Sequence, residues 1–216
     1  MNRRDFLKGM LVLPASIVAY DFLKSIETVG FNFGADIAYA SEIGTLDKKL
    51  VNMHENPPNQ KVEPFWEMPR RLKLERTASG EYFDAVYWEN GKLNVDGYTK
   101  LCWLLRDVRY KKAAWIDPRV LDILLAIQAW VAAYGYTKPI KITSGYRTPQ
   151  NNAQLEGAAK NSQHLLGKAI DFVVPDLPSN YIGLLARHYQ GGGVGFYPSS
   201  KFTHIDSGRV RTWVGK

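Results

Sequence analysis

The sequence predicts an α+β domain built on a small antiparallel sheet with flanking helices. Strand-like and helical segments are interspersed, but they lack the regular βαβ repetition of a doubly wound sheet. Asn90-Gly91 is a strong short signal for a hairpin, which is an antiparallel unit. The 216 residues, of which 45% are hydrophobic and 23% are charged, suit one globular domain with a short appendage.

Two strands are expected first, over 72–76 and 81–88, joined by a turn rich in small residues. The basic stretch 70–76 alternates charged with apolar residues. This alternation is typical of a strand whose charged residues lie on its solvent-exposed face. We therefore do not read the stretch as a nucleic-acid contact.

Two helices follow. Apolar residues recur at helical spacing over 96–108, which predicts one buried face. The second helix begins at Asp117-Pro118, a capping carboxylate followed by proline at the first helical position, and ends at Gly135. Its long apolar face predicts a role in the core.

The remaining chain alternates short elements. Strands are expected over 140–143, 169–174, 194–197 and 202–206, and helices over 149–156 and 179–189.

The first forty residues are typical of an export signal. Arg3-Arg4 precede Phe-Leu-Lys, as in the twin-arginine signal. An apolar stretch over 10–20 follows, shorter than the ~20 residues of a membrane-spanning helix. Ala38-Tyr39-Ala40 matches the small-x-small pattern of a cleavage site. The alternative is that the segment stays uncleaved and anchors the protein.

The Pro-rich segment 41–70 is interpreted as a linker or a surface arm.

Charge and cysteine content restrict the possible partners. Residues 1–40 contain four basic and four acidic residues, so the rest of the chain keeps the net charge of +7. An exported basic protein suits an anionic partner, such as cell-wall peptides with free carboxylates or an anionic membrane surface. The scattered basic residues argue against nucleic acid as the binding partner.

The single cysteine, Cys102, excludes an intramolecular disulfide, and its apolar neighbours predict a buried thiol.

His164, Asp171 and His204 form the ligand set expected of a catalytic zinc. Three protein ligands leave the fourth position of the metal open for water, unlike a closed structural site. Asp171 is the one polar residue on its face of an otherwise apolar strand. A buried carboxylate without a partner is costly, so Asp171 requires a metal or a cation. This arrangement points to hydrolysis.

Several motifs in a fixed order carry a family resemblance. They are Ser144-Gly145-Tyr146-Arg147, Ser162-x-His164-x-x-Gly167-x-Ala169-x-Asp171, Gly192-Gly193-Val194-Gly195-Phe196-Tyr197-Pro198 and His204-Ile205-Asp206. Together they resemble the MepK-type (YcbK-like) murein endopeptidases. The wider group includes the zinc D-Ala-D-Ala carboxypeptidases and the VanX-type dipeptidases, and shares its fold with the hedgehog signalling domain. The likeness extends from residue 71 to residue 213 and implies a zinc peptidase domain over 71–216.

The resemblance implies one zinc ion held by the two histidines and the aspartate named above. Arg147 matches an arginine that faces the substrate, where its planar guanidinium would hold a carbonyl oxyanion or a stem-peptide carboxylate. Ser162 and Gln163 are candidates for residues that form hydrogen bonds to the substrate near the metal. The alternative is that they only shape the loop that carries His164.

The general base is the point of departure from the family pattern. The VanX-type pattern has a glutamate three residues before the last histidine, where this chain has Lys201. Asp206 shares a strand face with His204 and is a candidate for a catalytic base or for a group that supports the ligand. Residues two apart on a strand lie ~7 Å apart, which is more than a ligand contact but close enough for one bridging water.

The sequence thus predicts an exported, periplasmic zinc peptidase that cuts peptide cross-links in peptidoglycan during cell-wall remodelling. Its partners would be peptidoglycan stem peptides, with membrane contact only through an uncleaved signal. A carboxypeptidase that removes terminal D-Ala and a zinc-stabilised wall-binding module without catalysis remain as alternatives.

Overall fold

A computed structural model describes residues 68–133 and 135–215. The expected signal segment and almost all of the linker lie outside these residues. Strands of the described part are β1 (Arg70–Arg76), β2 (Tyr82–Glu89), β3 (Lys92–Leu93), β4 (Ile140–Ser144), β5 (Ala169–Val173), β6 (Gly193–Tyr197), β7 (Phe202–Asp206) and β8 (Arg211–Val214). Its helices are α4 (Val95–Leu104), α5 (Pro118–Ala133), α6 (Pro149–Ala153), α7 (Ser179–His188) and the 3-10 turn η1 (Gln163–Leu166).

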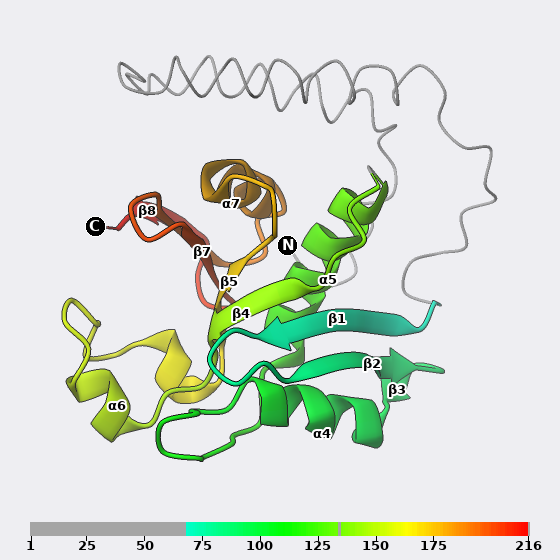
Figure 1. Ribbon diagram of the computed structural model, residues 1–216, viewed down its shortest axis with the longest axis horizontal. Helices are drawn as coiled ribbons and strands as arrows, with labels where there is room; N and C mark the ends of the chain where they lie inside the picture. Colours follow the sequence, from blue (N-terminus) through cyan, green and yellow to red (C-terminus); the bar gives the residue numbers. More distant parts are fainter. Residues whose placement is uncertain (1–67, 134, 216) are drawn as a thin grey trace. The chain divides into compact units, whose positions relative to one another are not determined.

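The strands form one mixed sheet in the order β3-β2-β1-β4-β5-β7-β6-β8 (Figure 1). Helices and strands combine as predicted, but the expected small antiparallel sheet was wrong. Two pairings are parallel, β1 with β4 and β6 with β8. Parallel neighbours need a long crossover, which α4 and α5 supply between β1 and β4. Strand β8 was not predicted, because its four residues carry no strong strand pattern and form a strand only beside β6.

Strand β1 buries two of its charges. The solvent-exposed face predicted for its charged residues holds for Arg71 and Lys73, but Arg70 and Arg76 lie on the buried face. The guanidinium of Arg70 donates to Asp122 of α5 at 2.8 Å and lies over the ring of Trp88. Burial lowers the pKa of Arg76 to about 10. Side chains two apart on a strand share a face, so Arg70 and Arg76 lie on the face of Leu72 and Leu74 and not with their exposed neighbours.

Helix α5 supplies much of the core, as its apolar face predicted. Val120, Leu121, Leu124 and Ile127 are fully buried. The helix packs on β1 and also contacts α7 and β7, while α4 covers β2 (Figure 1). The described residues contain no helix that is long and apolar enough to cross a membrane.

Helix α4 ends at Leu104, four residues earlier than predicted. The carbonyl of Leu105 accepts a hydrogen bond from the Tyr146 amide at 2.7 Å, just after β4. The Asp107 carboxylate accepts from the Thr148 amide and hydroxyl, both at 2.8 Å. The residues after α4 therefore hold the segment that follows β4, instead of continuing the helix.

Replacing Asp122 with alanine should lower the free energy of unfolding by about 3–5 kcal/mol, because Arg70 would stay buried without its carboxylate partner. Urea unfolding followed by circular dichroism measures the loss. Asp84→Ala removes the exposed partner of Arg71 and should leave stability nearly unchanged. Equal losses in the two variants would contradict the importance of the buried pair.

Candidate metal centre and active-site cleft

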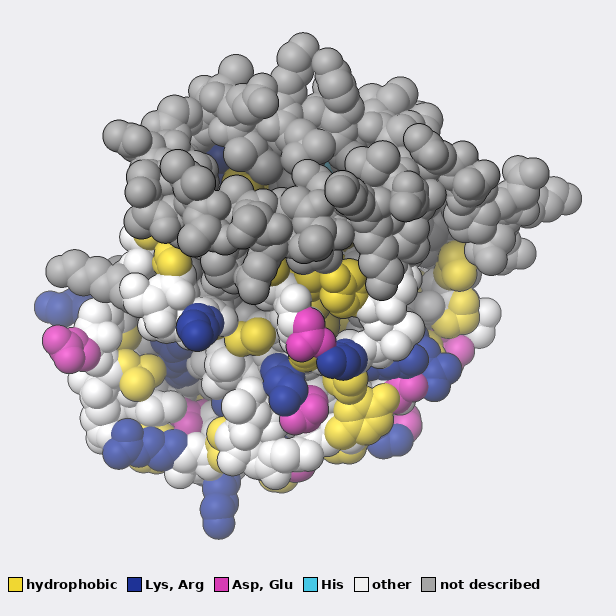
Figure 2. Space-filling view, turned by 45° about the horizontal axis from the view of Figure 1, so that its top comes forward, with side chains coloured by type: hydrophobic (Ala, Val, Ile, Leu, Met, Phe, Trp, Pro, Cys, Tyr) yellow, Lys and Arg dark blue, Asp and Glu magenta, His cyan; other side chains and the backbone are white. Residues whose placement is uncertain are grey.

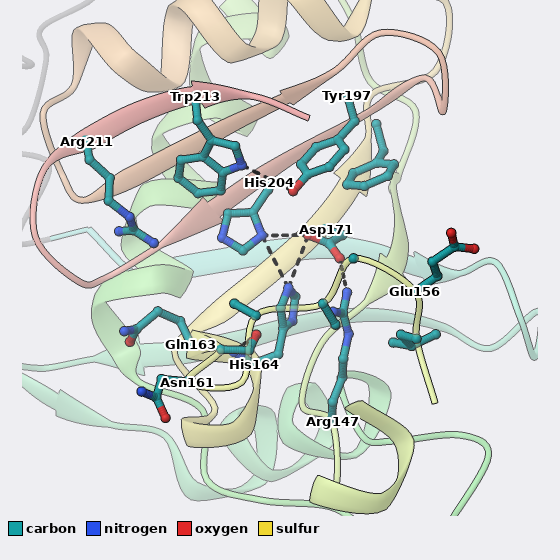
Figure 3. A pocket seen from close by; sticks show the side chains of 16 residues that line it. Arg147, Glu156, Asn161, Gln163, His164, Asp171, Tyr197, His204, Arg211 and Trp213 are labelled. Carbon is teal, nitrogen blue, oxygen red and sulfur yellow. Dashed lines mark hydrogen bonds and ion pairs between the residues drawn. The ribbon is translucent and has the colours of Figure 1, made fainter. Parts of the chain in front are cut away.

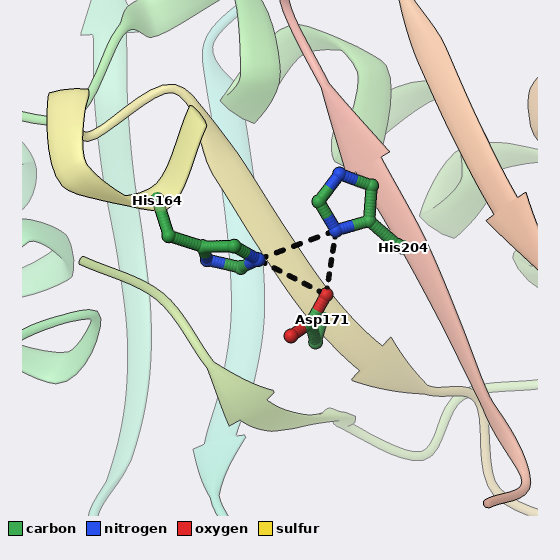
Figure 4. Close-up of side chains that lie close together, drawn as sticks. All are labelled: His164, Asp171 and His204. Atoms are coloured by element: carbon green, nitrogen blue, oxygen red, sulfur yellow. Dashed lines mark hydrogen bonds and ion pairs between the residues drawn. The ribbon is translucent and has the colours of Figure 1, made fainter. Parts of the chain in front are cut away.

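Three side chains from separate elements meet at one point of the sheet (Figure 4). His164 comes from η1, Asp171 from β5 and His204 from β7. Asp171 and His204 are direct neighbours in the antiparallel pairing of β5 with β7. The sequence therefore identified all three members of the cluster, and the strand register brings two of them together.

The ligand atoms of this cluster have the spacing of a metal site. His164 Nε2 lies 3.2 Å from both Asp171 Oδ1 and His204 Nδ1, and the last two atoms are 2.7 Å apart. Ligands on a tetrahedral zinc, each ~2.0–2.1 Å from the ion, would lie ~3.3 Å from one another. All three residues are buried. Two imidazoles and a carboxylate at these separations fit a divalent metal ion.

A backbone carbonyl fixes the tautomer of His164. Its Nδ1 lies 2.6 Å from the carbonyl oxygen of Gly145, and a carbonyl only accepts, so Nδ1 carries the proton. The neutral ring then presents an unprotonated Nε2 to the other two residues. A side chain at position 145 would collide with the backbone of Leu105, since its Cβ would lie 2.3 Å from that carbonyl oxygen. Glycine at this position is thus part of the site.

Asp206 fixes His204 in the opposite tautomer. His204 Nε2 donates to Asp206 Oδ2 at 3.1 Å, which leaves Nδ1 free to bind a metal. The contact between the two side chains is direct, although the ~7 Å spacing along the strand would also have admitted a bridging water. The ~7 Å spacing separates the Cα atoms of residues two apart on a strand, and the imidazole and carboxylate side chains together span this distance.

The Asp206 carboxylate is fully buried and saturated with donors. Besides His204, it accepts two hydrogen bonds from the guanidinium of Arg211, at 2.6 and 3.0 Å. The amides of Gly193 and Gly208 donate to its Oδ1 at 3.3 and 2.8 Å. Asp206 does not line the cleft. This position suits a group that orients His204. Both carboxylate oxygens of Asp206 already accept hydrogen bonds from the protein, so neither is open to water or substrate.

Arg147 contacts the third ligand. Its Nη2 donates to Asp171 Oδ2, and its Nε donates to the hydroxyl of Ser144 at 2.8 Å. The amide of Arg147 also donates to the carbonyl of His164 at 3.2 Å. The Ser-Gly-Tyr-Arg motif thus links β4 to two side chains of the cluster, in addition to placing an arginine on the cleft wall.

These contacts set the charge of the cluster. Burial by itself would raise the pKa of the Asp171 carboxyl, but His204, together with the ion pair to Arg147, holds that pKa well below its usual range. The pKa of Asp206 is likewise low, since hydrogen bonds from His204 and Arg211 outweigh its burial. Burial lowers the pKa of His164. At neutral pH both carboxylates are ionised and His164 is neutral. Burial would lower the pKa of His204, but hydrogen bonds to Asp171 and Asp206 raise it, so a metal that binds Nδ1 would displace the proton that this nitrogen shares with Asp171.

The cluster opens into a cleft of about 580 Å³ (Figure 3). Arg147 and the loop 155–159 line one part of it, and the aromatic residues Tyr197, Phe202 and Trp213 line another. Gln163 lies on the cleft wall. The Ser162 hydroxyl accepts from the His164 amide at 3.3 Å, so Ser162 also shapes the turn that carries the ligand.

Sequence reasoning missed three parts of the site. Arg211 and Trp213 belong to β8, the strand that was not predicted, and Tyr197 precedes the turn into β7. Gly192-Gly193-Val194-Gly195 was recognised as a motif, but its contacts were not. His188 is exposed at the end of α7, outside the cleft lining. Lys201 does not line the cleft either. Cys102 is buried, as predicted.

A buried cluster of two histidines and one aspartate, open on one side to a cleft, has the ligand types and the access for water that metal-dependent hydrolases use. Comparison with known proteins gives the family. A sequence profile described as peptidoglycan L,D-endopeptidase MepK matches residues 66–213. The chain belongs to this peptidase family.

Individual relatives agree with the family assignment. The peptidoglycan L,D-endopeptidase MepK of Escherichia coli K12 is 36% identical over 149 residues, which cover 67% of this chain and 80% of the relative. The probable peptidoglycan L,D-endopeptidase MepK of Haemophilus influenzae is 39% identical over 151 residues, covering 68% and 80%.

Asp206→Ala should weaken zinc binding about 10- to 100-fold, because His204 would lose the acceptor that fixes its tautomer. Competition with a chromophoric chelator measures the dissociation constant, and circular dichroism checks the fold. Arg209→Ala, which truncates an exposed side chain in the same turn, should leave zinc affinity unchanged. Unaltered affinity in Asp206→Ala would exclude the orienting role.

Proposed function

We propose that this protein is a zinc-dependent endopeptidase that hydrolyses peptide cross-links in peptidoglycan. The observation that carries the proposal is the set of three buried ligands whose metal-binding atoms face one another beside an open cleft. Membership of the MepK family supports peptidoglycan as the substrate class. The names of the relatives further support the L,D cross-link as the bond that is cut.

His164, Asp171 and His204 would hold the zinc ion. A zinc in such a site polarises a carbonyl and lowers the pKa of a bound water to ~7, which supplies a nucleophile at neutral pH. The protein's own part is to keep each ligand in its binding state. Gly145 and Asp206 hold the two imidazole tautomers, and Arg147 holds the second oxygen of Asp171.

Arg147 and Asp206 have different roles in this proposal. Arg147 lies on the cleft wall, where its positive charge suits a developing oxyanion or a stem-peptide carboxylate. Asp206 acts as the orienting partner of His204 and not as the general base, since both of its oxygens are already occupied by donors. Ser162 and Gln163 border the substrate from the turn that carries His164.

The proposal includes export to the periplasm, where peptidoglycan lies. Arg3-Arg4 and the apolar stretch after them support the twin-arginine route. The net charge of +7 suits an anionic polymer. On the face that Figure 2 shows, Lys and Arg side chains are scattered among acidic and apolar ones, unlike the continuous basic patch of a nucleic-acid-binding protein.

The test uses the purified protein, loaded with zinc, and defined muropeptide dimers cross-linked either through an L,D bond or through a D,D bond. Mass spectrometry should show the L,D dimer converted to monomers, with the reaction abolished by a chelator and restored by added zinc. His164→Ala should abolish both zinc retention and cleavage. His188→Ala, which removes the exposed histidine outside the cleft, should match the wild type.

Each alternative has a distinct product. Loss of a single D-Ala from a monomer would indicate a carboxypeptidase, and cleavage of the D,D dimer alone would exclude the proposed bond. Intact muropeptides together with retained binding to sacculi would indicate a wall-binding module and overturn the enzymatic proposal.

A further inference from the structure

An aromatic wall stands directly beside the metal ligands. Gly195 of β6 pairs with His204 on one side and with Trp213 on the other. A Cβ at position 195 would lie 2.7 Å from the Trp213 ring and 2.9 Å from the Tyr197 ring. The missing side chain leaves room for both rings, and the Trp213 ring centre lies 5.1 Å from that of His204.

Trp213 orients the hydroxyl of Tyr197. The indole Nε1 donates to the Tyr197 oxygen at 3.2 Å. An indole N–H only donates, so the phenol oxygen is the acceptor and its own proton remains available for a second partner. Among residues 68–133 and 135–215, no acceptor is hydrogen-bonded to this hydroxyl.

The Tyr197 ring is held in place by stacking on Phe202, with ring centres 4.3 Å apart and an angle of 14° between the planes. Its hydroxyl points into the cleft, toward Asp171 and His204 (Figure 3). Arg147 approaches from the opposite side in the same view. Its Nε and Nη2 are already engaged by Ser144 and Asp171. The cleft therefore offers a fixed, neutral donor across from the arginine.

We propose that Tyr197 is a catalytic residue that donates a hydrogen bond to the carbonyl oxygen of the scissile peptide as this oxygen gains negative charge. The proposal rests on the peptidase function above and adds a residue and a role to it. Tyr197 keeps its proton throughout, so the bond stabilises charge without acid catalysis. A donor that is already oriented costs no reorganisation when the charge develops.

The decisive variant is Tyr197→Phe, which keeps the ring and its stacking but removes the hydroxyl. We expect kcat on the cross-linked dimer to fall about 100-fold, with KM changed by less than about threefold, because the bond strengthens only in the transition state. Zinc affinity and the thermal midpoint should match the wild type. Tyr82→Phe, at an exposed tyrosine of β2, is the matched control and should retain full activity.

A binding measurement tests the same bond without turnover. A phosphinate analogue of the cross-linked peptide imitates the tetrahedral transition state. Isothermal titration should show its affinity for Tyr197→Phe reduced by about the same factor as kcat. Trp213→Phe, which keeps an aromatic ring but removes the indole donor, should reduce both quantities by a smaller factor.

The outcomes separate this proposal from the peptidase function. Wild-type cleavage combined with unchanged kcat and unchanged phosphinate affinity in Tyr197→Phe overturns the role of Tyr197 alone. Loss of zinc or of thermal stability in that variant also overturns it, because Tyr197 would then support the fold and not the reaction. A wild-type protein that neither cleaves muropeptides nor binds the phosphinate overturns both proposals.

Discussion

The pairing of β5 with β7 is the constraint on which the candidate site depends. It sets Asp171 directly opposite His204, so a carboxylate and an imidazole from distant parts of the chain face one another inside the sheet. A one-residue slip would turn one of the two side chains to the other face. Fully buried apolar residues of the same strands, Phe172 and Ile205, hold the register by packing into the core. The core thus determines where the polar cluster lies.

Every ligand of the cluster is held by a second partner. Gly145 accepts from His164, Asp206 accepts from His204, and Arg147 donates to Asp171. Each contact fixes a protonation state or an orientation before any metal arrives, which reduces the cost of ordering the site on binding. It also accounts for the two buried carboxylates. Asp171 and Asp206 each have a guanidinium and an imidazole as partners, so neither is buried as an uncompensated charge.

The fold reaches this arrangement through close backbone approaches near the sheet centre. Helix α4 ends early because Leu105 binds the backbone of Tyr146, and this contact is possible because Gly145 has no side chain. Gly195 similarly admits the two aromatic rings beside His204. A pattern of apolar spacing could not reveal either approach, which explains why the predicted helix ended four residues too late. The same limit applies to β8, whose position beside β6 brings Arg211 and Trp213 to the site.

The sequence by itself determined the element types, the core helix α5 and the three candidate ligands. Local spacing and residue chemistry are sufficient for those, since a cap, an alternating strand or a histidine–aspartate set is readable over a few residues. Only the tertiary structure decided that the sheet is mixed, that Arg70 and Arg76 are buried, and that Asp206 contacts His204 with no oxygen left for water. The reason is physical. Strand order and the burial of a charge depend on atoms that are distant in sequence, and Asp122 is such a partner of Arg70. Saturation of the Asp206 carboxylate depends on the turn that folds Arg211 back onto it and on Gly193 of the neighbouring strand.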